Sequence, residues 1–93
     1  MKRALVRSAA FIRAAKKFVK KQPAAAGAIR QTLVQLEADA FHPSLRTHKL
    51  KGDLSGCWAC SAGYDLRIVF EFVQRDGSEA ILLLSVGTHD EVY

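Results

Sequence analysis

The spacing of apolar residues along this 93-residue chain changes once, near His42-Pro43. Before that point apolar residues recur every three or four positions, which predicts two amphipathic helices, over about residues 11–21 and 24–39. Gln22-Pro23 interrupts the pattern, and a proline fits the first turn of a second helix. Because the connection is so short, we expect the two helices to form an antiparallel hairpin.

Strands are predicted on both sides of the helical region. Ala4–Arg7 indicates a short first strand, followed by Ser8 as the N-cap of the first helix. Downstream of His42-Pro43 the period becomes two, and Leu66–Val73 places alternate side chains on two faces of a strand. The dipeptide Asp76-Gly77 predicts a hairpin turn into the returning strand Ala80–Val86, which is apolar on both faces and therefore central.

A further strand is predicted for Cys57–Ala62, and it contains the spacing of a redox motif, Cys57-Trp58-Ala59-Cys60. Residues three apart in a strand point to opposite faces, and no helix follows to lower the pKa of a thiol. Two cysteines also cannot complete a four-ligand zinc site. We therefore interpret both as ordinary strand cysteines, and Trp58 as either a core residue or a stacking surface.

The order of these elements predicts an α+β fold, βααβββ(β), in which a helical hairpin packs on a small antiparallel sheet. A chain of this length makes one small domain, residues 1–93, with a single modest core. No apolar run reaches the ~20 residues of a membrane span, and no apolar segment of the ~7–15 residues found in signal peptides follows the basic N-terminus. We therefore expect a cytoplasmic protein.

Positive charge is concentrated in the first half of the chain. Residues 1–51 carry twelve Lys and Arg against two acids, which leaves +10, whereas residues 52–93 carry two against seven, which leaves −5. The polar face of the first predicted helix holds five of these cations: Arg13, Lys16, Lys17, Lys20 and Lys21. Such a surface favours an anionic partner, either nucleic acid or an acidic protein, and its alternative is a solvated helix face.

The C-terminal residues place chemically active groups at the end of an apolar strand. His89 is followed by Asp90, Glu91 and a terminal Tyr93. A histidine beside carboxylates can transfer protons near neutral pH, because the unperturbed pKa of an imidazole lies in that range. The alternative is a solvated surface histidine at a strand end.

Four segments in this order resemble the RelE/ParE superfamily of bacterial toxins from toxin–antitoxin pairs, over nearly the whole length. They are residues 11–21 (Phe-Ile-Arg-Ala-Ala-Lys-Lys-Phe-Val-Lys-Lys), residues 47–52 (Thr-His-Lys-Leu-Lys-Gly), residues 63–70 (Gly-Tyr-Asp-Leu-Arg-Ile-Val-Phe) and residues 85–93 (Ser-Val-Gly-Thr-His-Asp-Glu-Val-Tyr). The resemblance implies a RelE-like fold for the single domain. Since the chain stops at Tyr93, we expect no C-terminal helix.

Five residues match catalytic positions of this superfamily. His48, Asp65 and His89 match the YafQ-like branch, and Arg67 and Tyr93 match the RelE branch. The strand at 57–61 departs from both branches, because Ser61 stands where YafQ-like toxins carry a second histidine and the lysines of RelE are absent. The resemblance therefore implies an active site that lacks one titrating group.

The resemblance implies an mRNA endonuclease that acts in the ribosomal A site without a metal or a cofactor and is neutralised by a cognate antitoxin. It assigns proton transfer to His89, with His48 as a second proton carrier or phosphate contact and Asp65 orienting a histidine or sharing the proton transfer. Arg67 would bind the phosphate, and Tyr93 would stack on a base.

Ribosome and mRNA would then be the partners of the basic helix face, together with Lys49 and Lys51. Two alternatives stay open, a ParE-like toxin that binds DNA gyrase without cleavage and an inert antitoxin-binding relative. The predicted hairpin leads us to expect that His48, Asp65, Arg67 and His89 converge on one concave surface.

Overall fold

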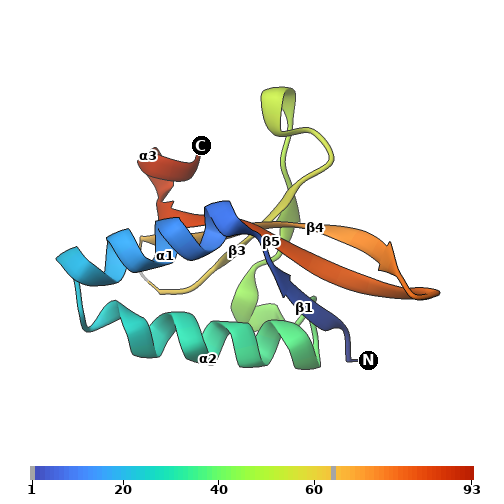
Figure 1. Ribbon diagram of the computed structural model, residues 1–93. Helices are drawn as coiled ribbons and strands as arrows, with labels where there is room; N and C mark the ends of the chain where they lie inside the picture. The colour runs from blue at the N-terminus through green and yellow to red at the C-terminus, as the bar shows by residue number, and fades with distance from the viewer. Residues whose placement is uncertain (1, 64) are drawn as a thin grey trace.

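The computed structural model describes residues 2–63 and 65–93, and Figure 1 shows the arrangement of the elements. In chain order they are β1 (Ala4–Arg7), α1 (Ala9–Lys21), α2 (Ala25–Ala38), the 3-10 turn η1 (Pro43–Leu45), β2 (His48–Lys49), the 3-10 turn η2 (Gly52–Leu54), β3 (Trp58–Ser61), β4 (Leu66–Arg75), β5 (Ser78–Thr88) and α3 (His89–Val92).

The strands form one five-stranded sheet in the order β1-β5-β4-β3-β2. The predicted α+β fold is confirmed, with β2 through β5 paired antiparallel. The first strand differs, because β1 pairs parallel with β5, with Ala4 opposite Ala80 and Arg7 opposite Leu83. A parallel pair needs a long crossover connection, and here residues 8–77, which contain both long helices and the other strands, form it.

The two long helices cover one face of the sheet, and α3 and η2 lie on the other side (Figure 1). The first helix begins where predicted, since the Ser8 hydroxyl accepts a hydrogen bond from the Phe11 N–H (3.0 Å). Phe11 packs into a core shared by both helices and the sheet. The largest fully buried side chains of that core are Leu36, Cys60, Ile68, Phe70, Ile81 and Leu83.

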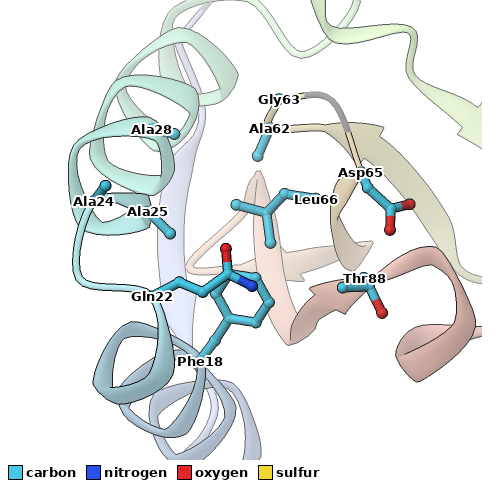
Figure 2. A pocket seen from close by; sticks show the side chains of 10 residues that line it. All are labelled: Phe18, Gln22, Ala24, Ala25, Ala28, Ala62, Gly63, Asp65, Leu66 and Thr88. Atoms are coloured by element: carbon cyan, nitrogen blue, oxygen red, sulfur yellow. The ribbon is translucent and has the colours of Figure 1, made fainter.

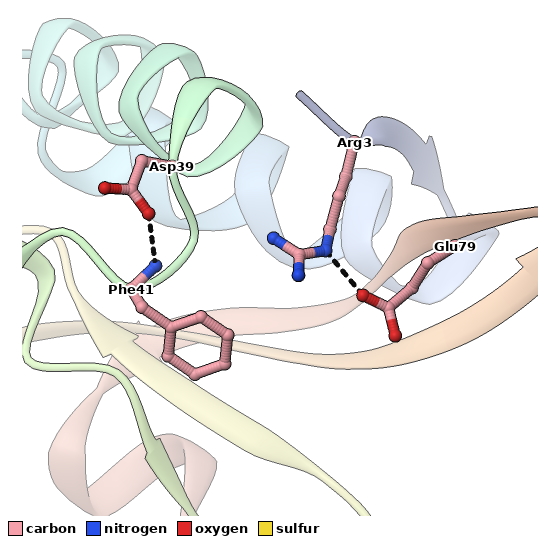
Figure 3. A network of polar contacts seen from close by, with 4 residues as sticks. All are labelled: Arg3, Asp39, Phe41 and Glu79. Atoms are coloured by element: carbon pink, nitrogen blue, oxygen red, sulfur yellow. Dashed lines mark hydrogen bonds and ion pairs between the residues drawn. The ribbon is translucent and has the colours of Figure 1, made fainter. Parts of the chain in front are cut away.

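A network of polar and aromatic contacts joins β1 to the end of α2 (Figure 3). The Arg3 Nε donates to the Glu79 carboxylate at 2.6 Å, and the guanidinium carbon lies 5.8 Å and 5.1 Å from the ring centroids of Phe41 and Phe72. The Phe41 N–H donates to the Asp39 carboxylate at 3.1 Å. These contacts fix the parallel edge strand against the rest of the sheet.

Alternation along β4 assigns each side chain to a face, as the sequence pattern predicts. Ile68 and Phe70 lie on the helix-covered face, and Arg67 and Val69 lie on the opposite one, which we call the second face. A β-bulge between Val69 and Phe70 places Leu84 of β5 outside the regular register. The turn at Asp76-Gly77 is confirmed, and both residues have positive φ, 52° and 79°.

The C-terminus corrects one expectation, because a one-turn helix, α3, follows β5 where none was predicted. The physical reason is a capping box: the Thr88 hydroxyl accepts from the Glu91 N–H, and the Glu91 carboxylate accepts from the Thr88 N–H. Among the described residues, no helix is long and apolar enough to cross a membrane.

The two cysteines are free thiols, as interpreted from their spacing. Cys60 lies in the core, and burial raises its pKa to about 12, an effect that the nearby Arg67 guanidinium partly offsets. Cys57 is half-buried, and desolvation followed by the Glu71 carboxylate raises its pKa. Trp58 packs against the core and against Phe72, with ring centroids 5.3 Å apart.

Candidate functional site

Arg67 lies on the second face of the sheet, near the start of β4. Directly opposite it are Ser61 on β3 and Gly87 on β5, both of them small. The side chain is half-buried, and its Nη1 donates a hydrogen bond to the Leu66 carbonyl oxygen at 3.2 Å. This bond uses one of the five guanidinium N–H donors, and such a planar fork suits bidentate contact with a phosphate.

Helix α3 folds back over the second face beside Arg67, and Gly87 is the residue that permits this. A Cβ atom at Gly87 would lie 3.0 Å from Oε1 and 3.2 Å from Cβ of Glu91, and 3.4 Å from Cγ1 of Val92. Because Gly87 shares its face with Arg67, these contacts place α3 against the same surface. The turn therefore delivers the C-terminal residues to the neighbourhood of the guanidinium.

The rings of His89 and Tyr93 meet edge to face on this turn, with centroids 4.6 Å apart and planes at 89°. The His89 Nδ1 lies 3.7 Å from the Asp90 carboxylate, and the imidazole is 57% exposed. A partly exposed imidazole held by a neighbouring ring is accessible to a ligand from one side. The edge-to-face contact orients this proton carrier.

Tyr93 connects α3 to the segment that follows β2. It lines a depression of about 310 Å³ together with Leu50, Lys51, Asp53 and Leu54. Burial raises the pKa of the Tyr93 hydroxyl, and the Arg67 guanidinium opposes that rise. Tyr93 as a whole stays 41% exposed, so its side chain can stack on a ligand.

His48 lies on the edge strand β2, opposite Ala59, and therefore on the second face. Its Nδ1 is 2.8 Å from the carbonyl oxygen of Arg46. A carbonyl can only accept, so Nδ1 carries the proton and Nε2 of the neutral ring keeps a free lone pair. His48 lies two inter-strand spacings from Val69 of β4, and Val69 lies two residues along β4 from Arg67. This separation corresponds to roughly 12 Å between the Cα atoms of His48 and Arg67.

Asp65 lies just beyond the β4–β5 pair, whose register ends at Leu66 and Thr88. Figure 2 shows its carboxylate pointing away from Leu66, at the rim of a pocket of about 390 Å³. The remaining pocket lining is mostly apolar and comes from the helical hairpin, the β3–β4 connection, and the paired strand ends at Leu66 and Thr88. No hydrogen bond or ion pair joins Asp65 to a histidine among the residues that the structure describes.

The predicted site residues are thus brought together to different degrees. Arg67 is paired with Gly87, on which the turn that carries His89 and Tyr93 packs, and we call these three side chains at the end of the β4–β5 pair the cluster. Asp65 borders this cluster at the end of the strand, and His48 shares the second face from its edge. The expected convergence is therefore tightest at Arg67 and α3.

The basic residues of α1 are all exposed, and one row of them lies beside Glu91 of the C-terminal turn. Lys17 and Lys21, four residues apart, line a depression of about 180 Å³ that reaches Ser85 and Glu91. Lys16 and Lys20, also four residues apart, form a separate row. Positive charge therefore borders the C-terminal turn.

The two lysines that follow the helical hairpin lie in different places. Lys49 lies away from the second face, with its ammonium nitrogen 5.5 Å from the Trp58 ring centroid, whereas Lys51 borders Tyr93.

Three residues of this site carry no candidate role in the sequence analysis: Gly87, Thr88 and Glu91. The signal for two of them is present, since Thr88-His89-Asp90-Glu91 has the spacing of a capping box. The requirement for a glycine at 87 has no sequence signature, because it arises from a contact with a turn that folds back.

Comparison with known proteins identifies the fold and the family. The structure superposes on YafQ from E. coli strain BL21(DE3) with a TM-score of 0.79, at 13% identity over 99% of both chains. It superposes on a chain of the E. coli DinJ-YafQ toxin-antitoxin complex with a TM-score of 0.76, at 14% identity over 100% of this chain and 99% of the other. A YoeB/ParE toxin from Agrobacterium tumefaciens gives 0.74 at 15% identity, over 92% and 98%.

No curated protein sequence matches this chain. The sequence profile of one family, described as the bacterial toxin of type II toxin-antitoxin system, YafQ, matches residues 3–93. This match spans nearly the entire chain and contains every residue of the cluster. The chain therefore belongs to the YafQ family of type II toxin–antitoxin toxins.

Proposed function

We propose that this toxin cleaves mRNA on translating ribosomes by attack of a 2′-hydroxyl on the adjacent phosphate. The observation that carries the proposal is the cluster at the end of the β4–β5 pair. It combines a guanidinium (Arg67), a proton carrier (His89) and an exposed aromatic face (Tyr93) on one surface. Each of these groups has a defined task in RNA cleavage.

In the proposed reaction the 2′-oxygen bonds to phosphorus and the bond from phosphorus to the 5′-oxygen breaks, which leaves a 2′,3′-cyclic phosphate and a 5′-hydroxyl. His48 takes the 2′ proton, because its Nε2 has a free lone pair while Nδ1 donates to the Arg46 carbonyl. His89, in its protonated form, donates a proton to the departing oxygen. Asp65, at the rim of the cluster, assists in placing or exchanging these protons.

Charge and alignment complete the proposed mechanism. Arg67 binds the phosphate oxygens through its fork and balances the charge that develops in the transition state. Tyr93 stacks on a base next to the scissile linkage and holds that linkage in line for attack. Ser61, directly opposite Arg67, has a hydroxyl that cannot replace a titrating imidazole, so we expect moderate cleavage rates.

Two partners follow from the proposal. The basic α1 row and Lys51 contact ribosomal RNA phosphates through charge. A cognate antitoxin neutralises the toxin. The superposition on a toxin that is seen in complex with an antitoxin, DinJ-YafQ, supports this partner.

The test substitutes His89→Gln and measures growth arrest together with primer extension on cellular mRNA. We expect arrest and cleavage to fall by roughly 10²-fold or more, within the range for loss of a general acid. His42→Gln is the matched control, because His42 lies outside the cluster and a glutamine keeps an acceptor for the Ser44 N–H. Cleavage that survives His89→Gln unchanged would contradict the assignment.

The same assay separates the other candidate functions. Growth arrest with intact mRNA and poisoned gyrase would support a ParE-like toxin that cuts no RNA. Absence of both arrest and cleavage, with an antitoxin still bound, would support an inert antitoxin-binding relative. Either result would overturn the nuclease proposal.

A further inference from the structure

Glu91 makes the contacts that hold the C-terminal turn in place. Its Oε1 accepts a hydrogen bond from the Thr88 N–H at 2.8 Å, and its own N–H donates to the Thr88 hydroxyl at 3.3 Å. The same Oε1 atom lies 3.0 Å from the position that a Cβ atom at Gly87 would take. Both hydrogen bonds therefore join Glu91, the third residue of this four-residue turn, to Thr88 at the end of β5.

The rest of the turn adds one apolar contact with the sheet. No residue of α3 is fully buried, and its apolar side chain, Val92, is half-buried beside Gly87. A four-residue helix is also far shorter than the ~12–15 residues at which isolated helices become marginally stable. The capping hydrogen bonds therefore keep the turn folded at the end of β5, where Val92 packs beside Gly87.

Charges from the helical hairpin reinforce this arrangement. The Thr88 backbone hydrogen bond holds the pKa of the Glu91 carboxyl below its usual value, and Lys21 and Lys17 act in the same direction. Both lysines border the same depression as Glu91. The ionised carboxylate is thus the favoured form in the folded protein, and it is the form that accepts the Thr88 hydrogen bond.

We infer that Glu91 is a positioning residue of this toxin, which holds His89 and Tyr93 beside Arg67 by capping α3. His89 and Tyr93 lie at the two ends of the turn, and the Tyr93 N–H donates to the His89 carbonyl oxygen at 3.2 Å. Loss of the cap releases both rings together. The catalytic part of this inference rests on the proposed nuclease function, whereas the structural part stands without it.

The test compares Glu91→Ala with Glu91→Gln. Both variants lose the negative charge, but only glutamine keeps a carbonyl oxygen that can accept from the Thr88 N–H. Glu91 supplies one of the two hydrogen bonds of the capping box, and the loss of one hydrogen bond lowers the population of the capped turn by about 2- to 13-fold, which is the effect expected for alanine. The first readout is the nuclear Overhauser contact between the His89 and Tyr93 rings, which needs no substrate.

We expect alanine to weaken this ring contact and glutamine to retain it, with the melting temperature of both variants close to that of the wild type. The second readout is mRNA cleavage on ribosomes, in which alanine should lower kcat with little change in KM and glutamine should restore kcat. An unchanged ring contact in the alanine variant, or a lost contact with full kcat, would overturn the inference. A wild-type protein that cuts no mRNA would refute the nuclease proposal, and the ring contact would still decide the role of Glu91.

Discussion

Substituting Gly87 by alanine tests how closely the C-terminal turn is packed on the sheet. The added methyl group would lie 3.0 Å from Oε1 and 3.2 Å from Cβ of Glu91, and 3.4 Å from Cγ1 of Val92. The carboxylate oxygen can rotate away only by giving up its hydrogen bond to the Thr88 N–H. The Glu91 Cβ atom is fixed to the backbone of α3, so the close contact with it can be removed only if the whole turn moves.

The structure indicates whether β5 or α3 moves to relieve these close contacts. Overpacking of a tight site typically costs about 1–3 kcal/mol, whereas replacing glycine by alanine gains about 0.4–1 kcal/mol through the unfolded chain. Moving β5 would disturb Val86, which is 4% exposed in the core, and the pairing of Gly87 with Arg67. No residue of α3 itself is fully buried, and only Val92 is half-buried. We therefore expect the turn to detach, with little change in global stability.

The expected functional result is a loss of cleavage in a folded protein. Detachment removes His89 and Tyr93 from Arg67, and the loss of one positioned acid costs roughly 10²–10⁴-fold. Primer extension on mRNA measures cleavage, and the ring contact between His89 and Tyr93 measures detachment. A Gly87→Ala variant that keeps both full cleavage and the ring contact would refute the packing argument.

Gly27→Ala is the matched control for this substitution. Gly27 lies exposed within α2, and an added Cβ atom meets nothing within 4 Å. Gly27 lies in the first turn of α2, and replacing glycine by alanine where the backbone allows it gains about 0.4–1 kcal/mol through the unfolded chain, which should raise the melting temperature by roughly 2–8 °C. Cleavage by this variant should equal that of the wild type. A loss of cleavage in Gly87→Ala can then be attributed to the position of the added methyl group.

Three further predictions follow from the site and the strand cysteines. Arg67→Ala should lower mRNA cleavage by about 10²–10³-fold in a protein with unchanged circular dichroism, and Arg67→Lys should restore it only in part because the fork is lost. Reversing Lys17 and Lys21 to glutamate should weaken ribosome binding and flatten its dependence on salt, by about 0.7–0.9 in the logarithmic slope per lost phosphate contact; an unchanged slope would indicate a solvated face. Cys57 should be alkylated before Cys60 in the native protein at pH 8, because a pKa of about 12 leaves only ~10⁻⁴ of the Cys60 thiol ionised, and mass spectrometry of labelled peptides measures the order.

Local features of the fold could be predicted from the sequence because each depends on neighbouring residues. Ser8 caps α1 through its own hydroxyl, and Asp76-Gly77 adopts positive φ at both turn positions. The alternation from Leu66 to Val73 assigns side chains to faces without knowledge of any partner. These interactions span a few residues, so the pattern contains all the information that they need.

Pairing between distant strands was not accessible in the same way. Nothing in Ala4–Arg7 indicates that it lies parallel to β5, since this arrangement depends on how the intervening hairpin crosses the sheet. The two-residue strand β2 is too short for a detectable period. Helix α3 is a different case, because its capping box was present in the sequence and was missed.

The sequence by itself determined which side chains carry the chemistry: a guanidinium on the central strand, histidines before and after it, and a terminal tyrosine. Only the tertiary structure decided which of them meet. Cross-strand pairing sets Arg67 against Gly87, and the missing side chain at that glycine lets α3 fold back. Two adjacent residues of β2 point to opposite faces because side chains alternate along a strand: His48 lies on the second face, and Lys49 lies over the Trp58 ring on the other face.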